Sequence, residues 1–123
     1  MDIIIRKYSK IFLALVSGKM NTKDVESFNN TLWDFINHMW ERSVIYLYID
    51  MSEVDDIDLN VDKKIADSLE ECFHVLSPKV RNIRGLFKIK ANEKVRKALE
   101  KAGLAEYTEW YDDFIKEISH QKR

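Results

Sequence analysis

The chain has 123 residues, of which 46% are hydrophobic and 33% are charged, so it can bury the core of one domain and keep a charged surface. Its 20 Lys and Arg residues nearly balance 21 Asp and Glu residues, which gives no electrostatic reason to expect a nucleic-acid partner or an anionic membrane, and we expect no direct membrane insertion. No apolar run reaches the roughly 20 residues of a membrane span, and the single cysteine, Cys72, excludes an internal disulfide. We expect one cytoplasmic domain over residues 1–123, with its core at about residues 3–118.

The first two predicted elements are strands joined by a tight turn. Residues 3–8 form a short strand. Residues 11–16 are almost wholly apolar, which predicts a strand buried on both faces that ends at Ser17 and Gly18. Because only a turn at residues 8–10 joins these strands, we expect them to pair antiparallel.

A helix of about five turns is predicted next, with Asn21 or Thr22 as its N-cap. Its apolar positions recur at helical spacing and are Val25, Phe28, Leu32, Phe35, Ile36 and Met39. The clearest strand follows at residues 44–49, where β-branched and aromatic residues dominate, and residues 50–53 leave it.

The second predicted helix follows Asn60 and stops just before Pro78. Its inward positions are Val61, Ile65, Leu69, Cys72 and Leu76. Its opposite stripe is polar and consists of Lys63, Asp67, Glu70 and His74. Phe73 flanks this stripe: an exposed Phe73 would be an apolar anchor for a partner, and a buried one would be core.

Residues 83–90 alternate between apolar and mostly basic positions, which predicts a strand with one face in water or at a sheet edge. Asn92 is the expected cap of the next helix, and Gly103 its left-handed C-terminal residue. Leu104 is then placed to touch Leu99.

A short strand near residues 107–110 and a last helix, capped by Asp112 or Asp113, complete the chain. Strands thus alternate with helices along the sequence. This order predicts an α/β fold with a mixed, mostly parallel sheet of about four to five strands, packed with about four helices.

Three segments, at residues 11–22, 49–58 and 95–104, carry a family resemblance. Through them the chain resembles the STAS domains of anti-sigma-factor antagonists, stressosome proteins and the cytosolic tails of sulfate transporters. Residues 11–22 are similar to a family strand that ends in Ser-Gly before a polar helix start. Residues 49–58 resemble the strand followed by Asp-x-Ser-x-Val-x-x-Ile-Asp, and residues 95–104 resemble Val-x-x-x-Leu-x-x-x-Gly-Leu. The resemblance runs from about Ile3 to Ile118 and implies the STAS fold.

The chain departs from this family at the position of its phosphorylation switch. In the antagonists, the last Asp of the second motif is followed by Ser, then by the phosphorylated Ser or Thr, then by Gly. Here Leu59, Asn60 and Val61 follow Asp58, so the acceptor position holds a residue without a hydroxyl. Because a phosphate would add about −2 charges to a fitted contact, neutral Asn60 should resemble the unphosphorylated, binding-competent state.

Plainer structural roles are open at the same residues. Asn60 could serve as the N-cap of the second helix. Asp58 is expected to be a cap or a loop-fixing acceptor, and Ser52 to bond local backbone.

The resemblance implies a non-catalytic, regulatory module that docks on a protein partner such as an anti-sigma-factor kinase or a related regulator. The candidate contact residues are Asp58, Leu59, Asn60, Lys63, Asp67, Glu70, Phe73 and His74. An alternative is a structural STAS subunit of a signalling assembly or a membrane-transporter complex. A further alternative is a small enzyme or ligand binder on a related fold.

The sequence suggests no catalytic, cofactor or metal site. Its three histidines are far apart, and no spacing matches a metal motif. Cys72 has the place of a small apolar core residue. Asp55, Asp56 and Asp58 form a carboxylate cluster, for which a polar turn is the simplest interpretation.

Overall fold

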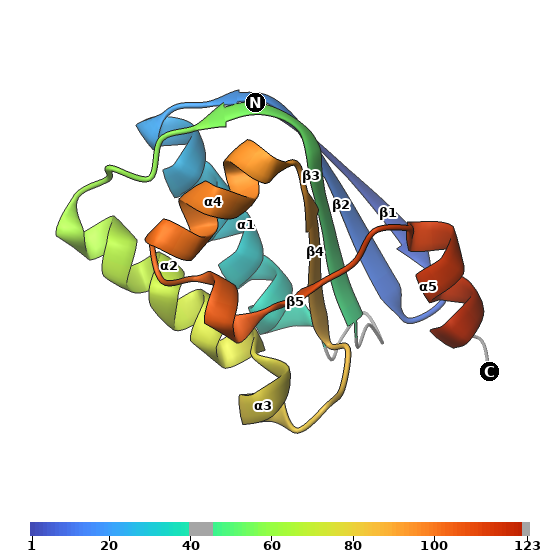
Figure 1. Cartoon of the computed structure of the whole chain (residues 1–123). Helices are drawn as coiled ribbons and strands as arrows, with labels where there is room; N and C mark the ends of the chain where they lie inside the picture. Colours follow the sequence, from blue (N-terminus) through green and yellow to red (C-terminus); the bar gives the residue numbers. More distant parts are fainter. Residues whose placement is uncertain (40–45, 122–123) are drawn as a thin grey trace.

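Five strands form one mixed sheet in the order β1-β2-β3-β4-β5. The structure is a computed structural model that describes residues 1–39 and 46–121 (Figure 1). The strands are β1 (Asp2–Tyr8), β2 (Ile11–Met20), β3 (Tyr46–Ile57), β4 (Phe87–Ala91) and β5 (Glu109–Trp110). β1 and β2 pair antiparallel across the tight turn, and the other neighbouring pairs are parallel. The mixed, mostly parallel sheet is confirmed; residues 44–45 of the third predicted strand lie outside the described residues.

Helices cover the two faces of the sheet unequally. They are α1 (Thr22–His38), α2 (Lys63–Leu76), α3 (Pro78–Arg81), α4 (Glu93–Lys101) and α5 (Phe114–Gln121), with a short 3₁₀ turn η1 (Ala105–Tyr107). α1, α2 and α4 lie on one face, and α5 lies on the other (Figure 1). The sequence did not predict α3. Pro78 follows the end of α2, as expected, but it also starts α3, because proline suits the first turn of a helix.

The predicted caps are confirmed where they depend on local chemistry. The side chain of Asn21 accepts a hydrogen bond from a backbone N–H in the first turn of α1, and Asn92 does the same for α4. At the end of α4, Gly103 has a φ of 75°. The N–H of Leu104 then donates to the carbonyl of Leu99 at 3.0 Å, the bond expected of a Schellman ending.

β2 is buried on both faces, which explains its continuous apolar run. Phe12, Ala14 and Val16 belong to the main core, which fills the space between the sheet and α1, α2 and α4. Ile11 and Leu13 point to the other face and form a smaller core. Tyr48, Tyr111 and Phe114 of α5 complete that smaller core.

The prediction that β2 ends at Ser17-Gly18 and that residues 50–53 leave β3 is wrong. Both strands continue, β2 to Met20 and β3 to Ile57. Two register shifts let the parallel ladder continue, and one of them lies at Gly18, which has a φ of 85°. Beyond the end of β4, carbonyls of β3 accept hydrogen bonds from the side-chain amide of Asn92. The mostly polar residues 50–53 therefore belong to a strand.

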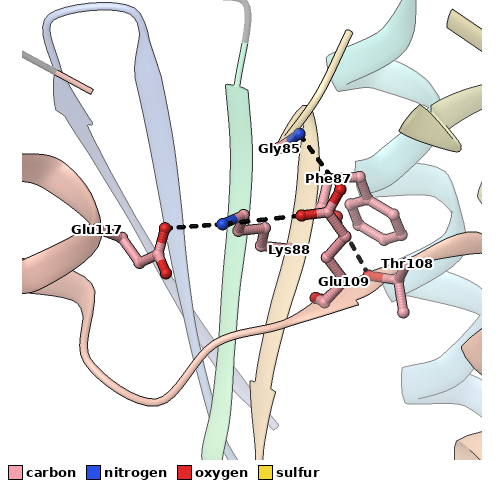
Figure 2. Close-up of polar contacts among 6 residues, drawn as sticks. All are labelled: Gly85, Phe87, Lys88, Thr108, Glu109 and Glu117. Atoms are coloured by element: carbon pink, nitrogen blue, oxygen red, sulfur yellow. Dashed lines mark hydrogen bonds and ion pairs between the residues drawn. The ribbon is translucent and has the colours of Figure 1, made fainter. Parts of the chain in front are cut away.

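β4 is shorter than predicted and lies inside the sheet. It begins at Phe87, because residues 83–86 form a turn in which Gly85 has a φ of 75°. β4 lies between β3 and β5, so the prediction of a wet or edge face is wrong for Lys88. Its Nζ lies 2.7 Å from a carboxylate oxygen of Glu117 on α5 and 3.7 Å from one of Glu109 (Figure 2). The basic residue thus joins α5 to the sheet.

Candidate protein-docking surface

The loop from β3 to α2 is held by Asp58. Its N–H donates to the carbonyl of Met20 at 2.9 Å, which ties the loop to the end of β2. Its side chain accepts from the N–H of Asn60 at 3.0 Å, as in an Asx turn. Asp58 is therefore a loop-fixing acceptor, which is one of its two predicted roles.

Asn60 is not the N-cap of α2, and that interpretation is wrong. Asp62 is the cap: its side chain accepts from the N–H of Ile65 at 3.0 Å. Asn and Asp cap helices about equally well, so packing makes the choice. Leu59 and Val61 are partly buried against the main core, and Asn60 between them is exposed. Its side chain is thus presented to solvent and has no capping role.

A shallow polar pocket of about 240 Å³ lies beside Asn60. It is bounded by the first turns of α1 and α2, and its lining residues are Thr22, Lys23, Glu26, Asn60, Val61, Asp62 and Ile65. The sequence did not indicate that the start of α1 contributes to this surface. The start of α1 does so because β2 and β3 run parallel, so the helices that follow these strands both begin at the same end of the sheet.

The packing of α2 against α1 sets which of its faces meets solvent. The hydroxyl of Ser68 accepts hydrogen bonds from Asn29 Nδ2 at 2.9 Å and from Trp33 Nε1 at 3.1 Å, both on α1. These bonds hold the Ser68 side of α2 inward. The predicted stripe lies on the opposite side and is exposed at all four positions, which are Lys63, Asp67, Glu70 and His74.

A second pocket of about 250 Å³ lies along this stripe and is acidic. It is lined by Asp67, Glu70, Glu71, His74 and Tyr107. The rings of His74 and Tyr107 meet edge to face, with centroids 5.5 Å apart. Interaction with the side chain of Glu106 raises the pKa of Tyr107, and the charges of Glu70 and Glu71 add to this effect. The pocket is suited to a basic side chain.

Phe73 belongs to the core and not to the surface. Only 1% of the residue is exposed, and its ring packs edge to face on that of Phe87, with centroids 5.1 Å apart. It therefore offers no anchor to a partner. Tyr107 supplies the aromatic surface beside the stripe instead. No sequence signal could have found it, because η1 brings it to α2 from a distant part of the chain.

The remaining candidate groups have structural surroundings. Cys72 is fully buried, and burial raises the pKa of its thiol to about 12. The hydroxyl of Ser52 donates to a carboxylate oxygen of Asp50 at 2.6 Å and not to backbone, which corrects the expectation. Asp55 and Asp56 lie in β3, so the carboxylate cluster is not a simple turn.

Neither a metal-ligand cluster nor a membrane-spanning helix is found in the part of the chain that the structure describes. Among the side chains that the structure describes, no group of three or more His, Cys, Asp or Glu is placed to hold a metal ion. Within the described residues, no helix is both long enough and apolar enough to cross a membrane.

The whole fold is similar to solved structures, although the sequence matches no protein-family model and no curated protein. An anti-sigma factor antagonist from Mycobacterium paratuberculosis superposes with a TM-score of 0.65 at 14% identity, covering 99% of this chain and 94% of that one. A putative anti-sigma factor antagonist from Thermotoga maritima gives 0.64 at 15% identity, over 98% and 95%. The antagonist SpoIIAA in its unphosphorylated form gives 0.59 at 9% identity, over 99% and 98%. The chain therefore has the fold of the anti-sigma-factor antagonists, the STAS-like α/β fold that its motifs predict.

Proposed function

We propose that this chain is a non-catalytic regulatory module that binds a protein partner, such as an anti-sigma-factor kinase or a related regulator. The likeness to antagonist structures over nearly its whole length supports this function. The observation that carries it is Asn60, an exposed side chain on a fixed loop with no capping role. A cytoplasmic setting is part of the proposal and agrees with the single, buried Cys72.

The docking surface, as we define it, runs from the Asn60 loop along the exposed stripe of α2. Its members are Asp58, Leu59, Asn60, Lys63, Asp67, Glu70 and His74, with Tyr107 added and Phe73 removed. The acidic pocket favours a partner that presents a lysine or arginine, because complementary charge steers association and selects the partner. Lys63 lies one helical turn before Asp67 and extends the surface toward the Asn60 loop.

Neutral Asn60 keeps the protein in a state that is always competent to bind. A negative charge at this position would lie within the polar pocket beside Glu26 and Asp62. The start of α2 tolerates such a charge, so the loss falls on the interface through desolvation and repulsion. Regulation at this position by phosphate is therefore not part of the proposal.

The experiment compares wild type with Asn60→Asp as baits in the native lysate, and then measures the affinity of each for the purified partner. Asn37→Asp is the matched control, because it adds the same charge at an exposed position near the other end of α1. We expect wild type and Asn37→Asp to capture a kinase-like protein, and Asn60→Asp to lose at least about tenfold in affinity. Unchanged affinity in Asn60→Asp would refute a docking surface that includes the Asn60 loop.

The structural-subunit alternative is favoured by one observation, the absence of a hydroxyl at Asn60. A scaffold part needs no switch. In that case all three baits would capture the same signalling-assembly or transporter proteins with equal yield.

A further inference from the structure

β1 leaves apolar side chains exposed on both faces of the sheet. Ile4 is 53% exposed and its neighbour Ile5 is 46% exposed. Because successive side chains of a strand point to opposite faces, these two residues leave apolar surface above and below the sheet. A helix could cover only one of these faces, whereas the side chains of an added strand would cover both.

β1 is also an open edge. β2 pairs with one side of β1, and no strand among the described residues pairs with the other. The opposite edge of the sheet is β5, which has only two residues. The helix layer stops short of β1, where an apolar pocket of about 90 Å³ lies between Ile3 and Ile5 of β1 and Phe28 and Phe35 of α1. At the far end of β1, the ring of Tyr8 packs against that of Phe114 on α5, with centroids 5.3 Å apart. The open part of the edge is therefore the run of residues 3–5, and an open apolar edge is a template for another strand.

The geometry of the hairpin determines which groups β1 offers. Tyr8 pairs with Ile11 across the two-residue turn, so Tyr8 directs its backbone polar groups at β2. Backbone direction alternates along a strand, and Ile3, Ile5 and Lys7 therefore direct theirs outward. In a two-fold pair, residues that face each other must share a face of the sheet. Every register centred on a residue of β1 meets both conditions. Only two of these registers pair all of Ile3, Ile4 and Ile5 within the strand, one centred on Ile4 and one on Ile5.

The charges of β1 distinguish these two registers. Centring on Ile4 places Asp2 opposite Arg6 twice, Ile4 opposite its own copy and Ile3 opposite Ile5. Opposite charges and matched apolar side chains are the favourable cross-strand pairs. Within the described residues neither Asp2 nor Arg6 takes part in an ion pair, so both are available.

Centring on Ile5 compensates no charge. It places Arg6 opposite Ile4 and Asp2 opposite Tyr8, and two basic side chains would then cover apolar ones. We propose that two copies of this chain form a symmetric dimer by antiparallel pairing of β1 with β1, centred on Ile4. The proposal uses no residue of the docking surface and does not rest on the proposed function.

The test is sedimentation equilibrium of the full chain over a wide concentration range, with charge-reversal variants. The wild-type mass should rise from the 14.6 kDa of one chain toward twice that value. Asp2→Arg alone sets like charges opposite each other, as does Arg6→Asp, and each should weaken self-association by about tenfold or more. An equimolar mixture of the two variants should regain the wild-type affinity, because every facing pair then joins opposite charges.

A proline variant tests the backbone contacts separately. Ile5→Pro removes an N–H that points outward and leaves the ladder to β2 in place, so it should abolish dimerisation with an unchanged circular dichroism spectrum. Ile115→Ser, at an exposed position on α5, should dimerise like wild type. A wild type that stays monomeric throughout would overturn the proposal, even if another protein's strand pairs with β1. Folded single variants that dimerise as tightly as wild type would also overturn it.

Discussion

Replacing Phe73 by alanine tests directly whether this residue is core or interface. The side chain is 1% exposed and packs edge to face on Phe87, in the middle of the main core. Truncating a buried phenylalanine costs about 3–5 kcal/mol, as the lost transfer energy plus the cavity left behind. Since the free energy of unfolding of a small domain is about 5–15 kcal/mol, Phe73→Ala should lose a large share of the total stability.

The assay is urea unfolding followed by circular dichroism, with ΔG extrapolated to water. Two variants at neighbouring positions calibrate it. His74→Ala lies next in sequence but is exposed, so it should change stability by no more than about 0.5 kcal/mol. Phe73→Leu keeps most of the buried volume and should cost under about 1.5 kcal/mol. A loss below about 1 kcal/mol in Phe73→Ala, together with weakened partner binding, would refute the assignment of Phe73 to the core.

Three further predictions concern a cap, an ion pair and a thiol. Asp62→Ala should lose about 1 kcal/mol of stability, and Asn60→Ala less than half as much, because Asp62 caps α2; the reverse order in urea unfolding would contradict the cap. Lys88→Met should lower the free energy of unfolding by about 1–2 kcal/mol, a value discounted for the partial exposure of its partner Glu117. A weaker near-ultraviolet circular dichroism signal from the smaller aromatic core would place the damage at α5, and an unchanged free energy of unfolding would contradict the role of this ion pair. The raised pKa of Cys72 stabilises the fold below the thiol's ordinary value of 9.0, and this contribution is lost as pH rises from there toward about 12. Wild type should therefore lose more stability than Cys72→Ala across that range, and equal slopes would speak against the raised value.

Local chemistry made part of this protein predictable from sequence. The caps Asn21 and Asn92 depend on a side chain and a backbone N–H three residues away, and both are confirmed. The ending at Gly103 and Leu104 is equally local. The apolar run of β2 required a strand buried on both faces, and the order of strands and helices led to the STAS-like fold.

Tertiary structure decided the features that depend on what lies opposite a residue. The mostly polar residues 50–53 continue β3 because a register shift keeps the parallel ladder and the side chain of Asn92 donates hydrogen bonds to the strand's carbonyls. No sequence periodicity shows either effect. Lys88 has the sequence signature of a solvated strand residue. In the fold, however, α5 places the distant residue Glu117 beside it as an ion-pair partner.

The candidate site divides in the same way. Helical periodicity predicted the exposed stripe of α2 because side-chain direction follows from the 3.6-residue turn. Periodicity could not tell whether Phe73, at the margin of that stripe, meets solvent or Phe87, nor could it choose between two good caps at Asn60 and Asp62. Both outcomes were decided by packing, because burial is a property of the neighbours that a side chain meets and not of the side chain alone.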